Sequence, residues 1–214
     1  LARRILRHFL VTVFDHGFFH ADPHPGNYRF RVDPDRGPNV VLYDYGSVAN
    51  LSERDRIMLL GLIADTGAQR GDPLGRLVEL GFREELLTPI ERKLPAICRV
   101  LFEPFENPAK FDLSAWRRTE RLDDVLGEDR WNFRMAGPAK LILLMRAFRG
   151  VLYYLERLGE PVSWGRALEP ILERNAAKLA SIPPRATSPR GPGFDALAKH
   201  LRIDITRSGE RRVS

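Results

Sequence analysis

The sequence predicts an α+β protein that is mostly α-helical and carries one short β-hairpin near its N-terminus. Residues 28–32 alternate between aromatic or apolar side chains and arginine, and residues 40–43 are continuously apolar. These patterns are typical of a half-exposed strand and a buried strand. The segment between them, residues 33–39, contains two prolines and a glycine and is typical of a turn. The two runs are therefore expected to pair, and the remaining segments show helical spacing.

The first helix is predicted at residues 2–14, where apolar side chains recur every three or four positions, and Gly17 ends it. Ser52 and Asp55 form a capping box that opens a helix at 53–66. Asp72 and Thr88 each precede a proline, which is a common helix start. Including those two starts, further helices are expected at 73–80, 89–102, 116–126, 138–158 and 164–181. The stretch at 138–158 is the most apolar, but its charged side chains argue against a membrane span.

Length and charge suggest one domain, residues 1–182, followed by a Pro- and Arg-rich linker and basic tail, residues 183–214. The chain has 214 residues and begins with Leu, so we expect it to be part of a longer protein. Its net charge is +6, and residues 183–214 hold seven basic residues against three acidic ones. The excess therefore lies mainly in the tail, where residues 201–207 alternate like a strand and residues 211–214 could be its hairpin mate. No interleaved aromatic and basic platform appears, which argues against a nucleic-acid partner. The single cysteine, Cys98, fits a reducing compartment.

The candidate chemistry lies in the catalytic loop, residues 20–27 (HADPHPGN), and in the triplet 44–46 (DYG). Asp22 and Asn27 have the spacing of the kinase catalytic loop, where the Asp accepts a hydroxyl proton and the Asn holds Mg²⁺. Asp44 opens a triplet like the kinase D-F-G, whose Asp binds the metal. The predicted hairpin would bring Asn27 and Asp44 close together, as two oxygen ligands of one hard cation must be. We therefore predict Asp22 as the catalytic carboxylate, and Asn27 and Asp44 as the metal ligands.

Two histidines accompany these residues. His20 precedes Asp22 by two positions, where protein kinases carry the His of H-R-D, and we assign it a supporting role in catalysis. His24 lies inside the loop and could contact a phosphate or substrate, or simply face solvent. Pro23 and Pro25 restrict the backbone and should stiffen the loop.

Residues 17–27 and 42–46 together resemble the signature of the UbiB (AarF-like) family of atypical protein-kinase-like proteins. The resemblance is close over roughly residues 1 to 60 and looser through the helical remainder. It implies a protein-kinase-like C-terminal lobe, with ATP and Mg²⁺ as cofactors, Asp22 as the catalytic Asp, and Asn27 and Asp44 as the metal-binding pair. It also implies a role in isoprenoid-quinone or lipid metabolism and an N-terminal lobe upstream of this chain. Tyr45 stands where the family usually has Phe.

The sequence contains no glycine-rich phosphate loop followed by a strand lysine, so this chain alone is expected to be inactive. The leading hypothesis is that the parent protein is an ATP- and Mg²⁺-dependent kinase or ATPase. We expect nucleotide, isoprenoid lipid or quinone-pathway proteins as partners, and a cytoplasmic location with peripheral contact at the inner face of a membrane. One alternative is a small-molecule phosphotransferase of the aminoglycoside or choline kinase type, although those usually carry an acidic residue where Gly46 stands. The other is a non-catalytic, pseudokinase-like scaffold that binds lipid or protein.

Overall fold

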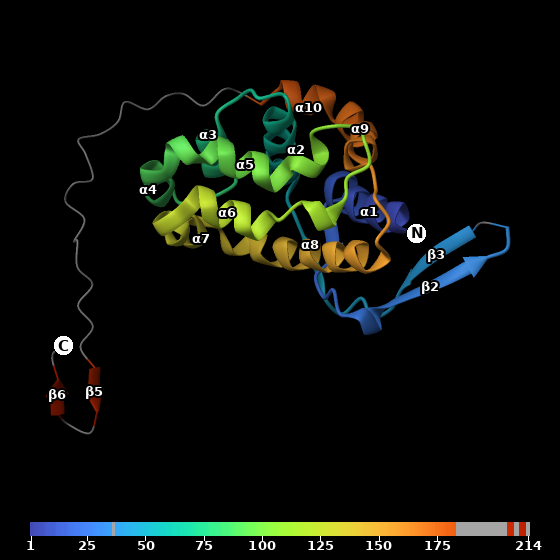
Figure 1. Ribbon diagram of the computed structural model, residues 1–214, viewed down its shortest axis with the longest axis horizontal. Helices are drawn as coiled ribbons and strands as arrows, with labels where there is room; N and C mark the ends of the chain where they lie inside the picture. Colours follow the sequence, from blue (N-terminus) through green and yellow to red (C-terminus); the bar gives the residue numbers. More distant parts are fainter. Residues whose placement is uncertain (36, 183–204, 208–209, 213–214) are drawn as a thin grey trace. The chain divides into compact units, whose positions relative to one another are not determined.

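A computed structural model of the chain describes residues 1–35, 37–182, 205–207 and 210–212. The chain divides into two compact units, Leu1–Pro183 and Pro184–Ser214. The first unit is mostly helical and contains two small antiparallel sheets (Figure 1). This agrees with the predicted mostly helical α+β fold class.

The N-terminal helix directly precedes strand β1 (Phe18–His20) and the catalytic loop in the chain. Helix α1 spans Ala2–Val11 and continues as a π-helical turn, Thr12–His16, which ends at Gly17 in the left-handed region with a φ of 75°. The Arg56 guanidinium donates to the carbonyl oxygens of Phe14 and Asp15, at 2.9 and 2.8 Å, and so satisfies the end of this turn. The buried side of α1 includes Ile5 and Leu6. The predicted helix ending at Gly17 is confirmed.

The predicted hairpin is also confirmed. Strands β2, Tyr28–Asp33, and β3, Gly37–Leu42, pair antiparallel with Tyr28 opposite Leu42. A hydrogen bond from the Arg4 side chain to Asn39 joins the hairpin to α1. A second sheet, β1 (Phe18–His20) with β4 (Val48–Asn50), was not predicted. Its strands have three residues each, too few for an alternating pattern to stand out.

The helices that follow the sheets pack into one bundle (Figure 1). They are α2 (Glu53–Gly67), α3 (Pro73–Glu79), α4 (Glu84–Leu87), α5 (Leu94–Phe102), α6 (Arg118–Leu126), α7 (Arg130–Ala136), α8 (Ala139–Leu158), α9 (Trp164–Arg174) and α10 (Ala176–Ala180). Short 3₁₀ turns connect some of them, at Thr88–Lys93, Glu103–Phe105, Leu113–Ala115 and Gly127–Asp129. Helices α4 and α7 were not predicted.

Two helix boundaries differ from the prediction. Residues 89–102 are a 3₁₀ turn followed by α5, and Thr88 is not an N-cap: its backbone is already helical, and its hydroxyl donates to the Glu84 carbonyl of the preceding α4. The predicted helix 164–181 is interrupted at Asn175, so that α9 and α10 are separate. The starts at Ser52 and Asp72 are confirmed, although the Asp72 side chain makes no capping hydrogen bond.

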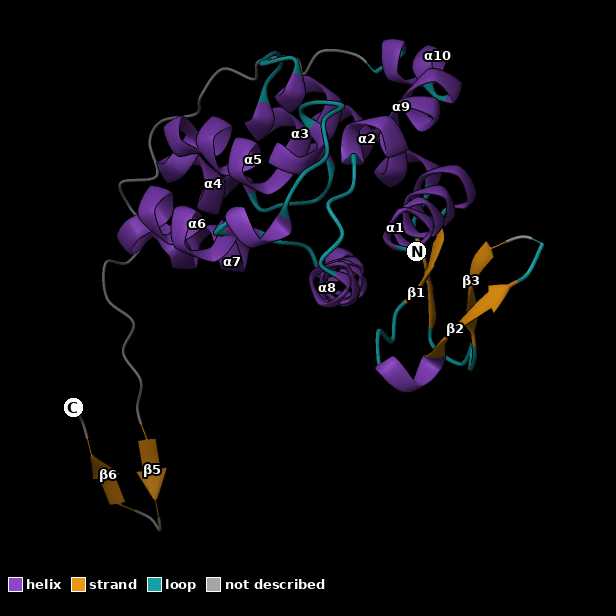
Figure 2. Ribbon diagram, turned by 45° about the vertical axis from the view of Figure 1, so that its right-hand side comes forward, coloured by secondary structure: helices purple, strands orange, loops and turns teal. Residues whose placement is uncertain are grey.

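Helix α2 lies between two hydrophobic clusters. The first cluster joins α1, β1, α8 and α9 around Trp164, which has no exposed surface. The second joins α3, α5 and α7 around Ile97. Leu60 of α2 belongs to the first cluster, and Leu62 belongs to the second. In Figure 2 the strands β1, β2 and β3 lie on the side of α1 and α8. The first cluster is therefore the one that supports the catalytic loop.

In the second unit, β5 (Ile205–Arg207) pairs antiparallel with β6 (Glu210–Arg212). This confirms the predicted tail hairpin for those residues. The predicted linker, 183–192, and residues 201–204 lie outside the described residues. Within the part of the chain that the structure describes, no helix is long and apolar enough to cross a membrane.

The start of α2 offers a test of the capping box. The Ser52 hydroxyl oxygen accepts from the Asp55 N–H at 3.1 Å and donates to the Asp55 carboxylate at 2.8 Å. We expect Ser52→Ala to lower the free energy of unfolding by about 1 kcal/mol, because the Asp55 N–H loses its acceptor. Urea unfolding followed by circular dichroism measures this. Ser52→Gly is the matched comparison and should cost only about a few tenths of a kcal/mol; equal losses for both variants would contradict the capping role.

Candidate functional site

The predicted catalytic loop begins where strand β1 ends at His20. The loop is anchored on the sheet side by a hydrogen bond from the Ala21 N–H to the Ser47 carbonyl, at 2.8 Å. It ends in a 3₁₀ turn, Pro25–Asn27, which leads directly into β2. His24 is the N-cap of this turn: its Nδ1 accepts from the Gly26 N–H at 3.1 Å. The exposed imidazole of His24 thus has a local structural role in shaping the loop.

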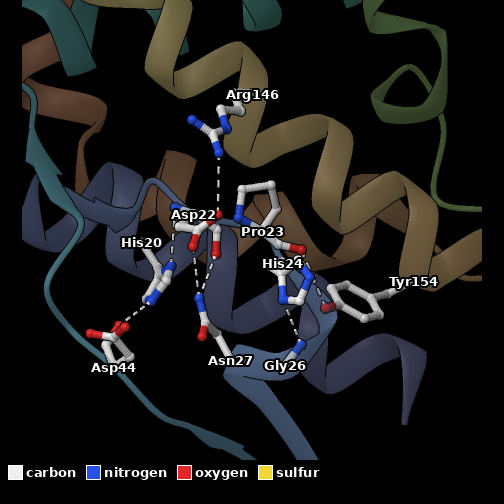
Figure 3. Close-up of polar contacts among 9 residues, drawn as sticks. All are labelled: His20, Asp22, Pro23, His24, Gly26, Asn27, Asp44, Arg146 and Tyr154. Carbon is white, nitrogen blue, oxygen red and sulfur yellow. Dashed lines mark hydrogen bonds and ion pairs between the residues drawn. The ribbon is translucent and has the colours of Figure 1, made fainter.

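Asp22 and Asn27 contact each other directly. The Asn27 side-chain amide donates to Asp22 Oδ2 at 3.0 Å and approaches the Asp22 backbone carbonyl at 3.4 Å (Figure 3). Because the amide nitrogen is used here, the amide oxygen of Asn27 is the atom that could ligate a cation. The Tyr43 N–H donates to the Asn27 carbonyl at 2.8 Å, which extends the hairpin pairing to the segment that leads into Asp44.

His20 bridges the loop and the DYG triplet. Its Nδ1 accepts from the Asp22 N–H at 3.2 Å, and its Nε2 lies 2.8 Å from the Asp44 carbonyl oxygen. The first bond requires an unprotonated Nδ1, so the second assigns the proton of the neutral ring to Nε2. His20 therefore links the predicted catalytic Asp to the predicted metal-binding Asp through their backbones.

Asp44 is exposed and has a left-handed backbone, with a φ of 53°. Asp and Asn tolerate this conformation better than most residues. One carboxylate oxygen accepts from the Gly46 N–H at 3.0 Å, which closes a tight turn. The ring of Tyr45 is 62% exposed and meets His20 edge-on at a centroid distance of 6.1 Å. The sequence-predicted residues thus form one chain of contacts from Asn27 through Asp22 and His20 to the backbone of Asp44.

Helix α8 supports the loop from the other side. A Cβ placed on Gly150 would lie only 1.9 Å from Cβ of Pro23, so the loop comes close to the helix at a position that has no side chain. The Tyr154 hydroxyl donates to the Pro23 carbonyl at 3.3 Å, and its ring packs on Tyr28 with centroids 4.8 Å apart. Because Gly150 and Tyr154 are one helical turn apart, they share the face that holds the loop.

The same face brings Arg146 to the site, a residue that no sequence pattern indicated. The Arg146 guanidinium lies 3.3 Å from Asp22 Oδ1, the carboxylate oxygen that Asn27 does not contact. Figure 3 shows Arg146 reaching Asp22 from α8, with Asn27 on the opposite side of the carboxylate. The four-residue spacing of Arg146, Gly150 and Tyr154 was visible in the sequence, but it did not indicate what this face contacts.

Burial controls the ionisation of the tyrosines beside the loop. Burial, with smaller contributions from Tyr28, Tyr153 and Asp22, raises the pKa of Tyr154 to about 12. Burial and then the charge of Asp22 raise the pKa of Tyr28 as well. The Tyr154 phenol therefore keeps its proton at neutral pH and remains a donor to the Pro23 carbonyl.

The donor set of the site suits a hard cation. Mg²⁺ prefers carboxylate and amide oxygens and usually keeps several water or phosphate ligands. Among the residues that the structure describes, no three or more His, Cys, Asp or Glu side chains gather into a metal-binding group. Asn27 offers an amide oxygen and Asp44 an exposed carboxylate, and both are donors of this kind.

Residues 1–69 match the family model described as the ABC1 atypical kinase-like domain. The N-terminal part of the chain is therefore ABC1 atypical kinase-like, which fits the predicted resemblance to the UbiB family. The matched segment contains Asp22, Asn27 and Asp44.

Two curated proteins are similar in sequence to parts of this chain. It is 30% identical over 154 residues to uncharacterized protein sll1770 of Synechocystis, a match that covers 69% of this chain and 24% of that protein. It is 38% identical over 84 residues to the chloroplastic protein ACTIVITY OF BC1 COMPLEX KINASE 8 of Arabidopsis thaliana, which covers 38% of this chain and 10% of that protein. The chain thus spans a quarter or less of the length of these relatives.

The close approach of Pro23 to α8 yields a prediction for Gly150→Ala. The added methyl group has no room, so the loop or the helix must move, and we expect a loss of about 1–3 kcal/mol in the free energy of unfolding. The matched control is Gly61→Ala in α2, because a Cβ at Gly61 would meet its neighbours at 3.4 Å or more. That variant should be neutral or gain up to about 1 kcal/mol from better helix propensity. Equal behaviour of the two variants in urea unfolding would contradict the close approach.

The Tyr154 phenol yields a prediction about alkaline pH. The phenol ionises near pH 10 in the unfolded chain but near 12 in the folded protein. Its stabilisation is therefore complete below pH 10 and is lost as the pH rises towards 12. At pH 9 we expect Tyr154→Phe to be about 1 kcal/mol less stable than the wild type, and this gap to narrow at pH 11. Urea unfolding at both pH values measures the gap. Tyr153→Phe, a neighbouring exposed phenol, is the control, and the same pattern in both variants would contradict the assignment to Tyr154.

Proposed function

We propose that the protein containing this chain is an ATP- and Mg²⁺-dependent atypical kinase or ATPase, and that this chain supplies its C-terminal lobe. The observation that supports the proposal most strongly is the contact between Asp22 and Asn27 together with the His20 bridge to Asp44. These are the residues at the spacing of a kinase catalytic loop and its metal-binding triplet. The match to the ABC1 atypical kinase-like domain supports the same class.

In this proposal Asp22 accepts the proton of the attacking hydroxyl group or water. Asn27 holds the Asp22 carboxylate in place, and His20 fixes the backbone on which it sits. Asn27 and Asp44 would hold Mg²⁺, which when bound neutralises charge on the phosphate oxygens. Tyr154 and Gly150 position the loop through Pro23 and contact no reacting atom.

The substrate class and the location are part of the proposal. The resemblance to the UbiB family supports isoprenoid-quinone or lipid metabolism, with an isoprenoid lipid or quinone-pathway proteins as partners. The name of the Arabidopsis relative, ACTIVITY OF BC1 COMPLEX KINASE 8, supports a kinase. The basic excess in residues 183–214 is compatible with peripheral contact to an anionic membrane surface from the cytoplasmic side.

The nucleotide and metal can be tested by thermal shift on the full-length protein, with ATP alone, Mg²⁺ alone and both together. Binding to the folded state should raise stability by about 2.7 kcal/mol at a hundredfold excess over Kd. We expect a rise that requires both ligands and is lost in Asp44→Asn. This substitution should leave folding intact, because Asn also tolerates the left-handed backbone and can accept from the Gly46 N–H.

Asp35→Asn is the matched control, since it removes an exposed carboxylate from the turn of the β2–β3 hairpin, which begins directly after Asn27. This variant should keep the full thermal shift. An unchanged shift in Asp44→Asn would refute the metal assignment. No shift under any condition would instead favour the non-catalytic scaffold.

A further inference from the structure

The Asp22 carboxylate is held between two donors from different elements. Asn27, from the loop, contacts Oδ2, and Arg146, from α8, contacts Oδ1. The metal-binding pair proposed above lies on the Asn27 side. Arg146 therefore supplies positive charge on the opposite side of the same carboxylate (Figure 3).

The place of Arg146 relative to Asp22 is set by packing. The contact of Pro23 with Gly150 and the bond from Tyr154 to the Pro23 carbonyl fix the loop on the helix. Arg146 is one turn before Gly150 on the same face, and Asp22 directly precedes Pro23. Any ligand that approaches Asp22 along α8 would thus meet the guanidinium.

The ion pair itself is poorly suited to a purely structural role. It joins one guanidinium nitrogen to one carboxylate oxygen at 3.3 Å, and the two side chains are 60% and 36% exposed. Exposed pairs of this kind contribute little to stability. Arg has five N–H donors in a fork that matches phosphate, with which it forms shorter, bidentate, charge-assisted hydrogen bonds. A phosphate oxygen can therefore replace the Asp22 carboxylate as the partner of Arg146 with little loss of stability.

We propose that Arg146 binds a phosphate group in front of Asp22, either the terminal phosphate of the nucleotide or a phosphate carried by the acceptor. The guanidinium then holds the bound phosphate, while Asp22 is released to accept a proton. The inference rests on the function proposed above and adds to it a phosphate-binding residue from outside the loop and the triplet.

The test is calorimetric titration of the full-length protein with inorganic pyrophosphate and inorganic phosphate, which requires no turnover. We expect Arg146→Ala to weaken binding of at least one of them by about tenfold or more, since a hydrogen-bonded charge pair is lost. Arg146→Lys should restore part of the affinity, because the charge remains while the bidentate fork is lost. Thermal denaturation of each variant shows whether it is folded.

The matched control is Arg149→Ala. Arg149 is an exposed arginine on the same helix, and its charge, after burial, contributes to lowering the pKa of Arg118. It should keep the affinity for both probes within about twofold, because only the net charge of the surface changes. Unchanged affinities in Arg146→Ala would overturn the proposal. Equal losses in Arg146→Ala and Arg149→Ala would also overturn it, since they would indicate general charge attraction.

Titrations with ATP and ADP distinguish the two sources of the phosphate. If Arg146 holds the terminal phosphate, Arg146→Ala weakens ATP but not ADP. If it holds a phosphate on the acceptor, both nucleotides bind as before and only inorganic phosphate is weakened. Failure of the proposed function would give a different result. The thermal shift with ATP and Mg²⁺ would then be absent, or unchanged in Asp44→Asn, whatever the phosphate affinity of Arg146→Ala.

Discussion

The imidazole of His20 joins the catalytic loop to the DYG triplet, in addition to the backbone hydrogen bonds between the neighbouring segments. It accepts from the Asp22 N–H and contacts the Asp44 carbonyl, so it couples the position of the loop to that of the triplet. Strands β1 and β4 supply the frame, with His20 opposite Val48. The orientation of Asp22 and Asn27, and the turn at Asp44, depend on this arrangement, because each extends from a backbone that the histidine or its sheet fixes.

The second support of the site is hydrophobic and comes from the first core cluster. Helices α1 and α8 and strand β1 share that cluster, and Trp164 of α9 fills its centre. The buried face of α8, which includes Gly150 and Tyr154, is thereby fixed where it meets the loop. A loop held by a histidine on one side and by a packed helix on the other is preorganised, which is what a site that works by positioning and electrostatics requires.

Local sequence patterns predicted most of the helices and the β2–β3 hairpin. They did not predict contacts between residues far apart in the sequence. The hairpin β2–β3 and the capping box at Ser52 follow from alternation, turn residues and a three-residue spacing, and the structure contains both. The support given by His20 was predicted from its place two residues before Asp22. Arg146 was not predicted, because it lies 124 residues from Asp22 and a helix pattern shows which face is apolar without showing its neighbour. Strands β1 and β4 have only three residues each, too few for an alternating apolar pattern to be recognised. The interruption between α9 and α10 falls at Asn175, where no Gly or Pro marks a helix end.

The position of α2 has a consequence for how this unit unfolds. Leu60 and Leu62 of α2 belong to different hydrophobic clusters. Unfolding of α2 with one cluster would therefore also remove packing contacts from the other. The two halves therefore form a single cooperative unit, although each has its own core. Local opening is restricted to segments outside both clusters, such as the exposed triplet at Asp44.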